Sequence, residues 1–195
     1  MLRANPQPEV SVVIPCFNLG AYLDEAVRSV LDQSYDDFEI LIVDDGSDDE
    51  VTRLMLATYE RPRTSVIRIE NSGVANARNV GFEASRGRYV SFLDPDDLLE
   101  PRFLERTIGA LEKDRSLAFA SCWLTAFGNR QFEWRPESCE FPALLAEDTV
   151  CTAAPVRREV LDAIGGFDSA PALDGYEDWD LAVTIVGAGH PGVIV

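Results

Sequence analysis

The sequence predicts an α/β fold in which a central, mostly parallel sheet carries helices on both faces. In the first hundred of the 195 residues, short apolar runs alternate with segments whose apolar residues recur at helical spacing. The apolar runs are continuous, as is typical of strands that are covered on both faces. Both observations indicate one α/β domain.

The strands expected in this first half cover residues 10–14, 38–43, 65–69 and 89–93. Apolar residues three and four positions apart predict the helices between them: Leu23, Ala26, Val27, Val30 and Leu31 in the first, Val51, Leu54, Met55 and Tyr59 in the second, and residues 74–84 in the third. Three of the strands are followed by polar clusters. Because ligands of open parallel sheets bind beyond the carboxyl ends of the strands, these clusters predict a site at that edge.

The second half has a less regular pattern. An amphipathic helix is expected over residues 101–113, with Phe103, Leu104, Thr107, Ile108 and Leu111 on one face. One strand is expected over 117–127, a hairpin or loop over 128–141, helices over 156–164 and 181–186, and a strand from 192. The sequence stops within this last apolar run, so we expect a single domain, 1–195, that is cut short at its C-terminus.

Charge and cysteine content exclude several classes of function. The 17 basic and 34 acidic residues give a net charge of −17, which repels nucleic acid and anionic membrane surface. No run approaches the roughly 20 apolar residues of a membrane span, and the polar N-terminus is not a secretory signal. Four dispersed cysteines (Cys16, Cys122, Cys139, Cys151) and one histidine make no zinc motif. We expect a cytoplasmic protein with reduced thiols, with any attachment to the inner face of the membrane made by parts outside this chain.

Two acidic clusters follow predicted strands. Alternate carboxylates in Asp94-Pro-Asp-Asp97 could hold Mg²⁺ or Mn²⁺, although aspartate and proline are also ordinary turn residues. In Asp44-Asp-Gly-Ser47, a carboxylate could bind a base or ribose. The alternative is a plain strand-to-helix turn in which Ser47 or Asp48 caps the helix.

Two further segments could carry chemistry. Residues 71–79 open a helix whose amide groups and Arg78 could meet an anionic ligand, although Arg78 could also be an ordinary surface residue. In Glu177-Asp-Trp-Asp180, a carboxylate could act as a general base beside a tryptophan that limits solvation or stacks on a sugar. The alternative is an acidic first turn of a helix, which the helix dipole favours.

Taken in order, these motifs resemble the family 2 glycosyltransferases, which have the GT-A fold and bind nucleotide sugars. The matching segments are Ser11-Val-Val-Ile-Pro-Cys-Phe-Asn18, Val43-Asp-Asp-Gly-Ser47, Asn71-Ser-Gly-Val-Ala-Asn-Ala-Arg-Asn79, Phe92-Leu-Asp-Pro-Asp-Asp97, Arg157-Arg-Glu-Val-Leu-Asp-Ala-Ile-Gly-Gly-Phe-Asp168 and Glu177-Asp-Trp179. Each segment is weak alone, but six in the family's order make a specific match.

The resemblance implies a nucleotide-binding half at about residues 8–100 and an acceptor-binding half at about 101–195. The implied nucleotide-binding residues are Pro15, Asn18, Asp44, Arg78 and Asp94. In the family's Asp-X-Asp motif, Asp96 would bind the divalent cation, Mn²⁺ or Mg²⁺. Asp178 matches the catalytic base, with Glu177 and Trp179 beside it to bind the acceptor. The implied reaction transfers a sugar from a nucleotide-diphosphate donor, most often a UDP-sugar, to an acceptor hydroxyl and inverts the anomeric carbon. The implied acceptor is a glycan, a lipid-linked molecule or another hydroxyl compound, as in polysaccharide biosynthesis.

Three other classes of function could be encoded by an alternating α/β chain of this kind. A nucleotide-sugar-binding module without turnover stays open, and metal-dependent transfer or donor hydrolysis distinguishes it from an enzyme. A phosphoacceptor signalling domain needs a lysine late in the sheet, whereas the single lysine, Lys113, lies in a predicted helix. A dinucleotide oxidoreductase needs G-x-G-x-x-G after the first strand, where this chain has Pro15-Cys-Phe-Asn-Leu-Gly20.

Overall fold

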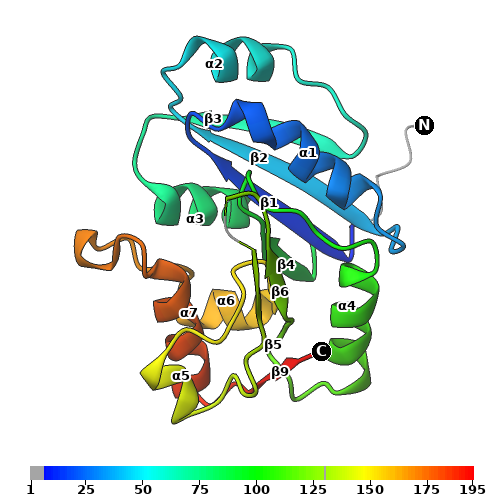
Figure 1. Ribbon diagram of the computed structural model, residues 1–195, viewed down its shortest axis with the longest axis vertical. Coiled ribbons are helices and arrows are strands. Elements are labelled where there is room, and N and C mark those ends of the chain that lie inside the picture. The colour runs from blue at the N-terminus through cyan, green and yellow to red at the C-terminus, as the bar shows by residue number, and fades with distance from the viewer. Residues whose placement is uncertain (1–6, 130) are drawn as a thin grey trace.

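A mixed sheet of seven strands, in the order β3-β2-β1-β4-β8-β5-β9, runs through the computed structural model (Figure 1). The structure describes residues 7–129 and 131–195. The first four strands are parallel: β1 (Val10–Cys16), β2 (Phe38–Asp45), β3 (Thr64–Ile69) and β4 (Tyr89–Phe92). Strand β8 (Val156–Arg157) is antiparallel to β4 and to β5 (Phe119–Ser121), and β9 (Gly192–Ile194) is parallel to β5.

Helices cover both faces of this sheet. One apolar core includes residues of α1 (Gly20–Leu31), α2 (Glu50–Ala57) and α4 (Phe103–Lys113), and the other includes residues of α3 (Val74–Ala84), α6 (Arg158–Ile164) and α7 (Glu177–Gly187). Strand β1 shows the alternation: Val12 and Ile14 belong to the first core and Val13 to the second. The predicted α/β fold class is therefore confirmed. No helix within the described ranges has both the length and the apolar character needed to cross a membrane.

Helix α3 packs closely on β1 and β2 because it carries Gly81 at the contact. A Cβ at this position would lie 2.2 Å from Val13 Cγ1 and 3.1 Å from Val43 Cγ2. We expect Gly81→Ala to lower the free energy of unfolding by about 1–3 kcal/mol, because the helix must move away from the sheet. Urea unfolding would measure this change.

Gly109→Ala is the matched control, because Gly109 lies within α4 and a Cβ there would meet no atom within 4 Å. Alanine is the better helix former, so this variant should gain roughly 0.5–1 kcal/mol. Equal stabilities of the two variants would contradict the close packing of α3 on β1.

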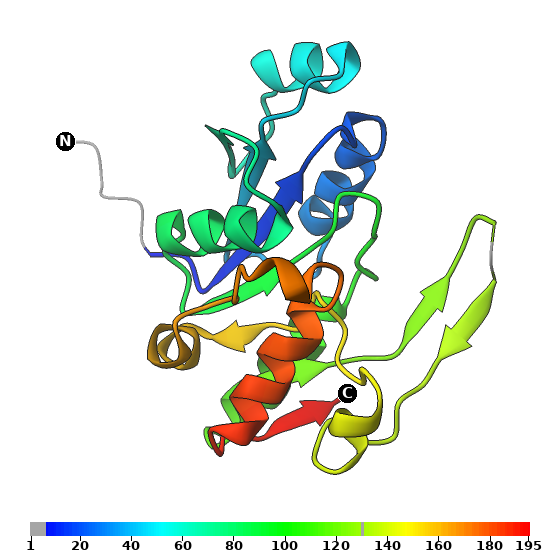
Figure 2. The same cartoon turned by 90° about the vertical axis from the view of Figure 1, so that its left-hand side faces the viewer.

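The expectation of one continuous strand over residues 117–127 is wrong, because the segment forms two separate strands. Residues Phe119–Ser121 form β5 and are wholly buried, whereas Leu124–Ala126 form β6, which leaves the sheet and is largely exposed. Strand β6 pairs antiparallel with β7 (Phe132–Trp134) in a separate hairpin that projects from the molecule (Figure 2). The hairpin expected over 128–141 therefore begins earlier, at β6, and only its second strand, β7, lies in that range. A short helix, α5 (Ala143–Ala146), follows.

Two other expectations need correction. The segment 156–164 is not all helix: its first two residues form β8, a strand too short to show a period of its own. The apolar face predicted for α2 is only half right: Met55 and Tyr59 pack against the core, whereas Val51 and Leu54 are 65% and 64% exposed. Thr52 faces inward instead, because its Oγ1 accepts a hydrogen bond from the Gly20 N–H at the start of α1 (2.8 Å).

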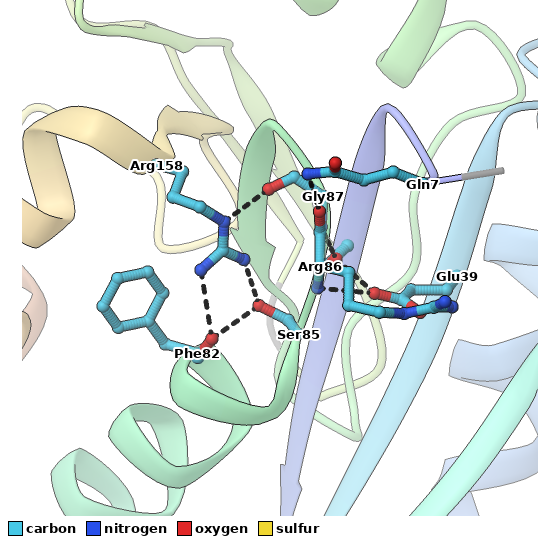
Figure 3. Close-up of polar contacts among 8 residues, drawn as sticks. Gln7, Glu39, Phe82, Ser85, Arg86, Gly87 and Arg158 are labelled. Atoms are coloured by element: carbon cyan, nitrogen blue, oxygen red, sulfur yellow. Dashed lines mark hydrogen bonds and ion pairs between the residues drawn. The ribbon is translucent and has the colours of Figure 1, made fainter.

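Two adjacent arginines attach the second half of the chain to the first. The Arg158 guanidinium donates to Gly87 O (2.6 Å) and to Ser85 Oγ, beyond the end of α3 (Figure 3). Arg157, which is 5% exposed, donates to Leu111 O (2.6 Å) and Tyr89 Oη (3.0 Å). These contacts explain the paired arginines at the start of the sequence motif 157–168 as anchors of the fold.

Candidate active site

The carboxyl end of β2 carries two adjacent aspartates that are both buried but have different partners. Asp44 Oδ1 accepts from the Ser47 N–H (2.9 Å), and Oδ2 lies 2.8 Å from Nε of Arg68 on β3. Asp45 accepts instead from the N–H groups of Ser72 (2.8 Å) and Gly73 (2.9 Å). Asp45 therefore fixes the loop that leads into α3, a role that the sequence analysis did not assign.

The loop after β1 is tied to the loop after β2 by Asn18. Its backbone is left-handed, with φ of 57°, which asparagine tolerates better than most residues. Asn18 Oδ1 accepts from the N–H groups of Asp48 (3.0 Å) and Asp49 (3.1 Å). Asp49 in turn caps α2 by accepting from the Thr52 N–H, so neither Ser47 nor Asp48 is the capping residue.

Arg78 lies at the centre of the candidate site and is 2% exposed. Its Nη2 lies 2.8 Å from Asp94 Oδ1, and its Nη1 lies 2.9 Å from Glu177 Oε1. Glu177 Oε2 accepts from the Gly175 N–H (2.8 Å), so both oxygens of this buried carboxylate have partners. Arg78 is thus not a surface residue: it joins the end of β4 to the start of α7.

The neighbouring Asn79 attaches the segment after α6 to the same helix. Its Nδ2 donates to Phe167 O, and its Oδ1 accepts from the Phe167 N–H, both at 2.9 Å. The Phe167 ring packs edge-on against Phe92 of β4 and lies 5.3 Å from the Arg78 guanidinium carbon. Three segments that are distant in sequence therefore meet at α3.

Three carboxylates follow β4 in the turn at residues 94–97. Asp94 is committed to Arg78, whereas Asp96 is exposed. The pKa of Asp97 is raised to about 6, first by desolvation and then by the nearby carboxylates of Asp94 and Asp96. This accumulation of negative charge fits a divalent cation.

Within residues 7–129 and 131–195, no three histidine, cysteine, aspartate or glutamate side chains are grouped as a complete metal site. Mg²⁺ and Mn²⁺ commonly take one or two carboxylates and complete their shell with ligand phosphates and water. The residues at this turn fit a cation shared with a phosphate-bearing ligand, with Asp96 and Asp97 as the exposed carboxylates.

Asp178 lies in the first turn of α7, beside Glu177. Its Oδ2 accepts from Thr152 Oγ1 (2.7 Å), and its Oδ1 accepts from the Trp179 N–H (2.8 Å). Two hydrogen bonds orient the carboxylate and leave lone pairs for a further donor. Asp148 lies near it: the pKa of Asp148 is raised, first by burial and also by the Asp178 charge. Local sequence patterns do not indicate Thr152 or Asp148, because both approach Asp178 only through the fold.

The remaining predicted residues lie around this group. Pro15 is buried in β1. The indole N–H of Trp179 donates to Leu144 O of α5 (2.6 Å), and its ring centroid lies 6.3 Å from that of Tyr176. The structure thus brings Arg78, Asp94, Glu177 and Asp178 into one site, while Asn18 and Asp44 lie at the ends of the neighbouring strands β1 and β2. The roles of the individual residues stay predictions.

Removal of the Arg78 guanidinium should strongly destabilise this site. We expect Arg78→Met to lower the free energy of unfolding by about 3–5 kcal/mol, because it leaves the Asp94 and Glu177 carboxylates without their shared partner. Arg28→Met is the control: Arg28 makes an ion pair with Asp24 on the surface of α1, and its loss should change stability little. Chemical denaturation of both variants tests this, and a small loss for Arg78→Met would contradict its central position.

Comparison with known proteins extends these observations. Residues 11–165 match the family described as glycosyl transferase family 2. TuaG of Bacillus subtilis (strain 168), named for glycosyl transfer in teichuronic acid biosynthesis, is 44% identical over 119 residues, which are 60% of this chain and 46% of TuaG. Chondroitin synthase of Escherichia coli is 39% identical over 112 residues, 57% of this chain and 16% of the synthase. The chain thus matches less than half the length of these relatives.

Solved structures agree on the fold. S. aureus TarS 1-349, in complex with UDP-GlcNAc, has a TM-score of 0.77 at 19% identity, covering 96% of this chain and 56% of TarS 1-349. The mannosyltransferase PcManGT from Pyrobaculum calidifontis, in complex with GDP-Man and Mn²⁺, has a TM-score of 0.72 at 21% identity, covering 97% of this chain and 55% of PcManGT. The predicted GT-A fold is confirmed by this likeness.

The family match starts in β1 and ends just after α6. It includes the parallel strands, the acidic turn after β4 and the helix that carries Arg78. Because the match extends over most of the chain, the protein belongs to glycosyl transferase family 2.

Proposed function

We propose that this protein transfers a sugar from a nucleotide-diphosphate donor to an acceptor hydroxyl, in a metal-dependent reaction that inverts the anomeric carbon. One observation carries the proposal: buried Arg78 binds both Asp94 and Glu177. This contact joins two acidic segments that lie more than 80 residues apart in sequence. One segment would bind the donor, and the other would activate the acceptor.

The donor would bind at the ends of β1, β2 and β4, in the half formed by residues 8–100. Pro15 and Asn18 would line the nucleotide pocket, and Asp44 would accept a hydrogen bond from the base. Asp94 would lie near the ribose, and Arg78, which binds Asp94, would lie near the phosphates. The TarS complexes named for UDP and UDP-GlcNAc support a UDP-sugar donor, whereas the GDP-Man complex of PcManGT makes GDP-mannose the donor to test beside it.

A divalent cation, Mn²⁺ or Mg²⁺, would be held at the acidic turn by Asp96 and by the donor's own phosphate oxygens. When bound, it would offset the negative charge that develops on the leaving diphosphate. The exposure of Asp96 and the raised pKa of Asp97 support a turn that favours positive charge. Because the net charge of −17 repels a phosphate-bearing ligand, such a cation would reduce this repulsion at the site.

Asp178 would act as the general base. Its carboxylate would take the proton of the acceptor hydroxyl as that oxygen bonds to the anomeric carbon, while the bond from this carbon to the diphosphate oxygen breaks. Thr152 would position the carboxylate through its hydrogen bond to Oδ2. A single displacement of this kind inverts the anomeric configuration.

Glu177 and Trp179 would form the acceptor side in the half formed by residues 101–195. Arg78 holds the Glu177 carboxylate, and α5 holds the Trp179 indole. Both side chains would therefore be in position before the acceptor binds. The names of TuaG and chondroitin synthase support a polysaccharide acceptor. The four free thiols fit a reaction in the cytoplasm.

The test is turnover of UDP-GlcNAc and GDP-mannose with Mn²⁺, with water and chitin oligosaccharides as acceptors. We expect release of the nucleoside diphosphate from one donor, its loss in EDTA, and an initial product of inverted anomeric configuration in proton NMR. Binding of a donor without any release would instead indicate a nucleotide-sugar-binding module. Retained configuration would contradict the single displacement assisted by Asp178.

A further inference from the structure

Two cysteine thiols lie side by side within the acceptor half, residues 101–195. Cys122 directly follows β5, and Cys151 lies in the loop before β8. Their Sγ atoms are 3.9 Å apart, and both residues are partly exposed. The other two cysteines, Cys16 and Cys139, are buried in the apolar cores.

The backbone near these thiols is already held in place for a bond between them. Ser121 precedes Cys122, and its Oγ accepts from the Cys151 N–H (3.0 Å) and lies 3.5 Å from Cys151 Sγ. A disulfide needs an S–S distance of about 2.05 Å, so the two sulfurs must approach by roughly 2 Å. Rotation of the side chains and a small shift of the loop that carries Cys151 can supply this movement.

The two thiols also differ in reactivity from the buried pair. The contact between the two thiols, in which either sulfur can donate, lowers the pKa of Cys151 and raises the pKa of Cys122. Burial raises the pKa of Cys16 and of Cys139 to about 11. The thiolate is the form that reacts with oxidants, so we expect Cys151, whose pKa is lowered, to react before Cys16 and Cys139, whose pKa values are raised.

Cys151 is covalently linked to the residue that holds the candidate base. Thr152 follows it directly and donates to Asp178 Oδ2 (2.7 Å). Cys151, Thr152 and Asp178 also line one small, mostly apolar cavity, together with Phe167 and Ile185. A shift of the loop that carries Cys151 toward Cys122 would move Thr152 with it and weaken the contact between Thr152 and Asp178.

We propose that Cys122 and Cys151 form a reversible disulfide when the protein meets a peroxide, and that this bond slows sugar transfer without preventing nucleotide binding. The Cys151 thiolate attacks hydrogen peroxide, which gives a sulfenic acid and hydroxide. The Cys122 thiol then attacks this sulfur, the S–S bond forms and water leaves, so that two thiols are oxidised and one peroxide is reduced. The effect on transfer rests on the proposed function, whereas formation of the bond does not.

The first arm of the test maps the bond in the full chain. After treatment with hydrogen peroxide, free thiols are alkylated and the protein is cleaved after glutamate, which separates Cys139 from Cys151 because Glu140 and Glu147 lie between them. Mass spectrometry should find the Cys122 and Cys151 peptides joined, with a mass lower by two hydrogens, and Cys16 and Cys139 alkylated. Alkylation of all four cysteines, or a different pairing, would overturn the proposal.

The second arm links the bond to turnover of UDP-GlcNAc with Mn²⁺. Oxidation should lower UDP release several-fold, dithiothreitol should restore it, and UDP affinity should stay unchanged. Cys122→Ser and Cys151→Ser should keep the activity of the reduced protein and lose its inhibition by peroxide. A mapped disulfide with unchanged UDP release would overturn the effect on transfer. No turnover even when reduced, with the disulfide mapped, would contradict the proposed function but not the bond.

Discussion

Replacement of Asp178 by asparagine is expected to lower sugar transfer by about a thousandfold while nucleotide affinity stays close to that of the unchanged protein. The amide cannot take a proton from the acceptor hydroxyl, but it keeps the size of the side chain and can still accept from Thr152 Oγ1. The measurement is UDP release from UDP-GlcNAc with Mn²⁺, paired with UDP binding by calorimetry.

Asp180→Asn is the matched control for this prediction. Asp180 lies in the same first turn of α7, two residues beyond Asp178. Since the proposal gives it no role in proton transfer, its variant should keep most of the activity. Similar losses of transfer in both variants, or a loss of UDP binding in Asp178→Asn, would contradict the division of the site into a donor part and a base.

Replacement of Asp96 by alanine is expected to weaken Mn²⁺-dependent nucleotide binding at least about a hundredfold, since even the outer-shell partners of metal ligands contribute on the order of 10–100-fold to metal affinity. Asp96 and Asp97 are the exposed carboxylates of the turn after β4, because Asp94 is already bound to Arg78, and the Asp-X-Asp motif assigns the cation to Asp96. Binding of UDP with Mn²⁺ and with EDTA measures the effect. Metal-free affinity should not change.

Asp97→Asn is the control within the same turn. Its side chain adds negative charge near Asp96 but has no assigned contact with the cation, so the variant should lose much less Mn²⁺-dependent UDP binding than Asp96→Ala does. If Asp97→Asn loses binding and Asp96→Ala keeps it, the cation is held by the other carboxylate and the proposed assignment is wrong.

Local patterns in the sequence were sufficient to predict the four parallel strands β1–β4. Strands β1 and β2 are wholly or almost wholly buried, and such strands are readable as continuous apolar runs. The predicted apolar face of α4 is confirmed residue by residue, because an amphipathic helix packed on one side shows its period directly. The position of the acidic clusters at the ends of β2 and β4 followed from the same pattern.

Other features depend on contacts that local patterns do not encode. Strand β8 has two residues, and its only signature is pairing with β4 and β5. The partners of Arg78 are also non-local: Glu177 lies 99 residues further along the chain. Sequence reasoning named both residues but assigned them to different ligands, whereas the structure shows that they bind each other.

The most direct test of the central claim is calorimetric titration of UDP, GDP and dTDP into this chain, with and without Mn²⁺. We claim that the acidic turn held by Arg78 binds a nucleoside diphosphate through a shared cation. We expect that UDP binds, that binding requires Mn²⁺, and that Asp96→Ala weakens it at least about a hundredfold. Absence of binding by all three nucleotides to the folded protein, or equal affinity in EDTA, would contradict the claim.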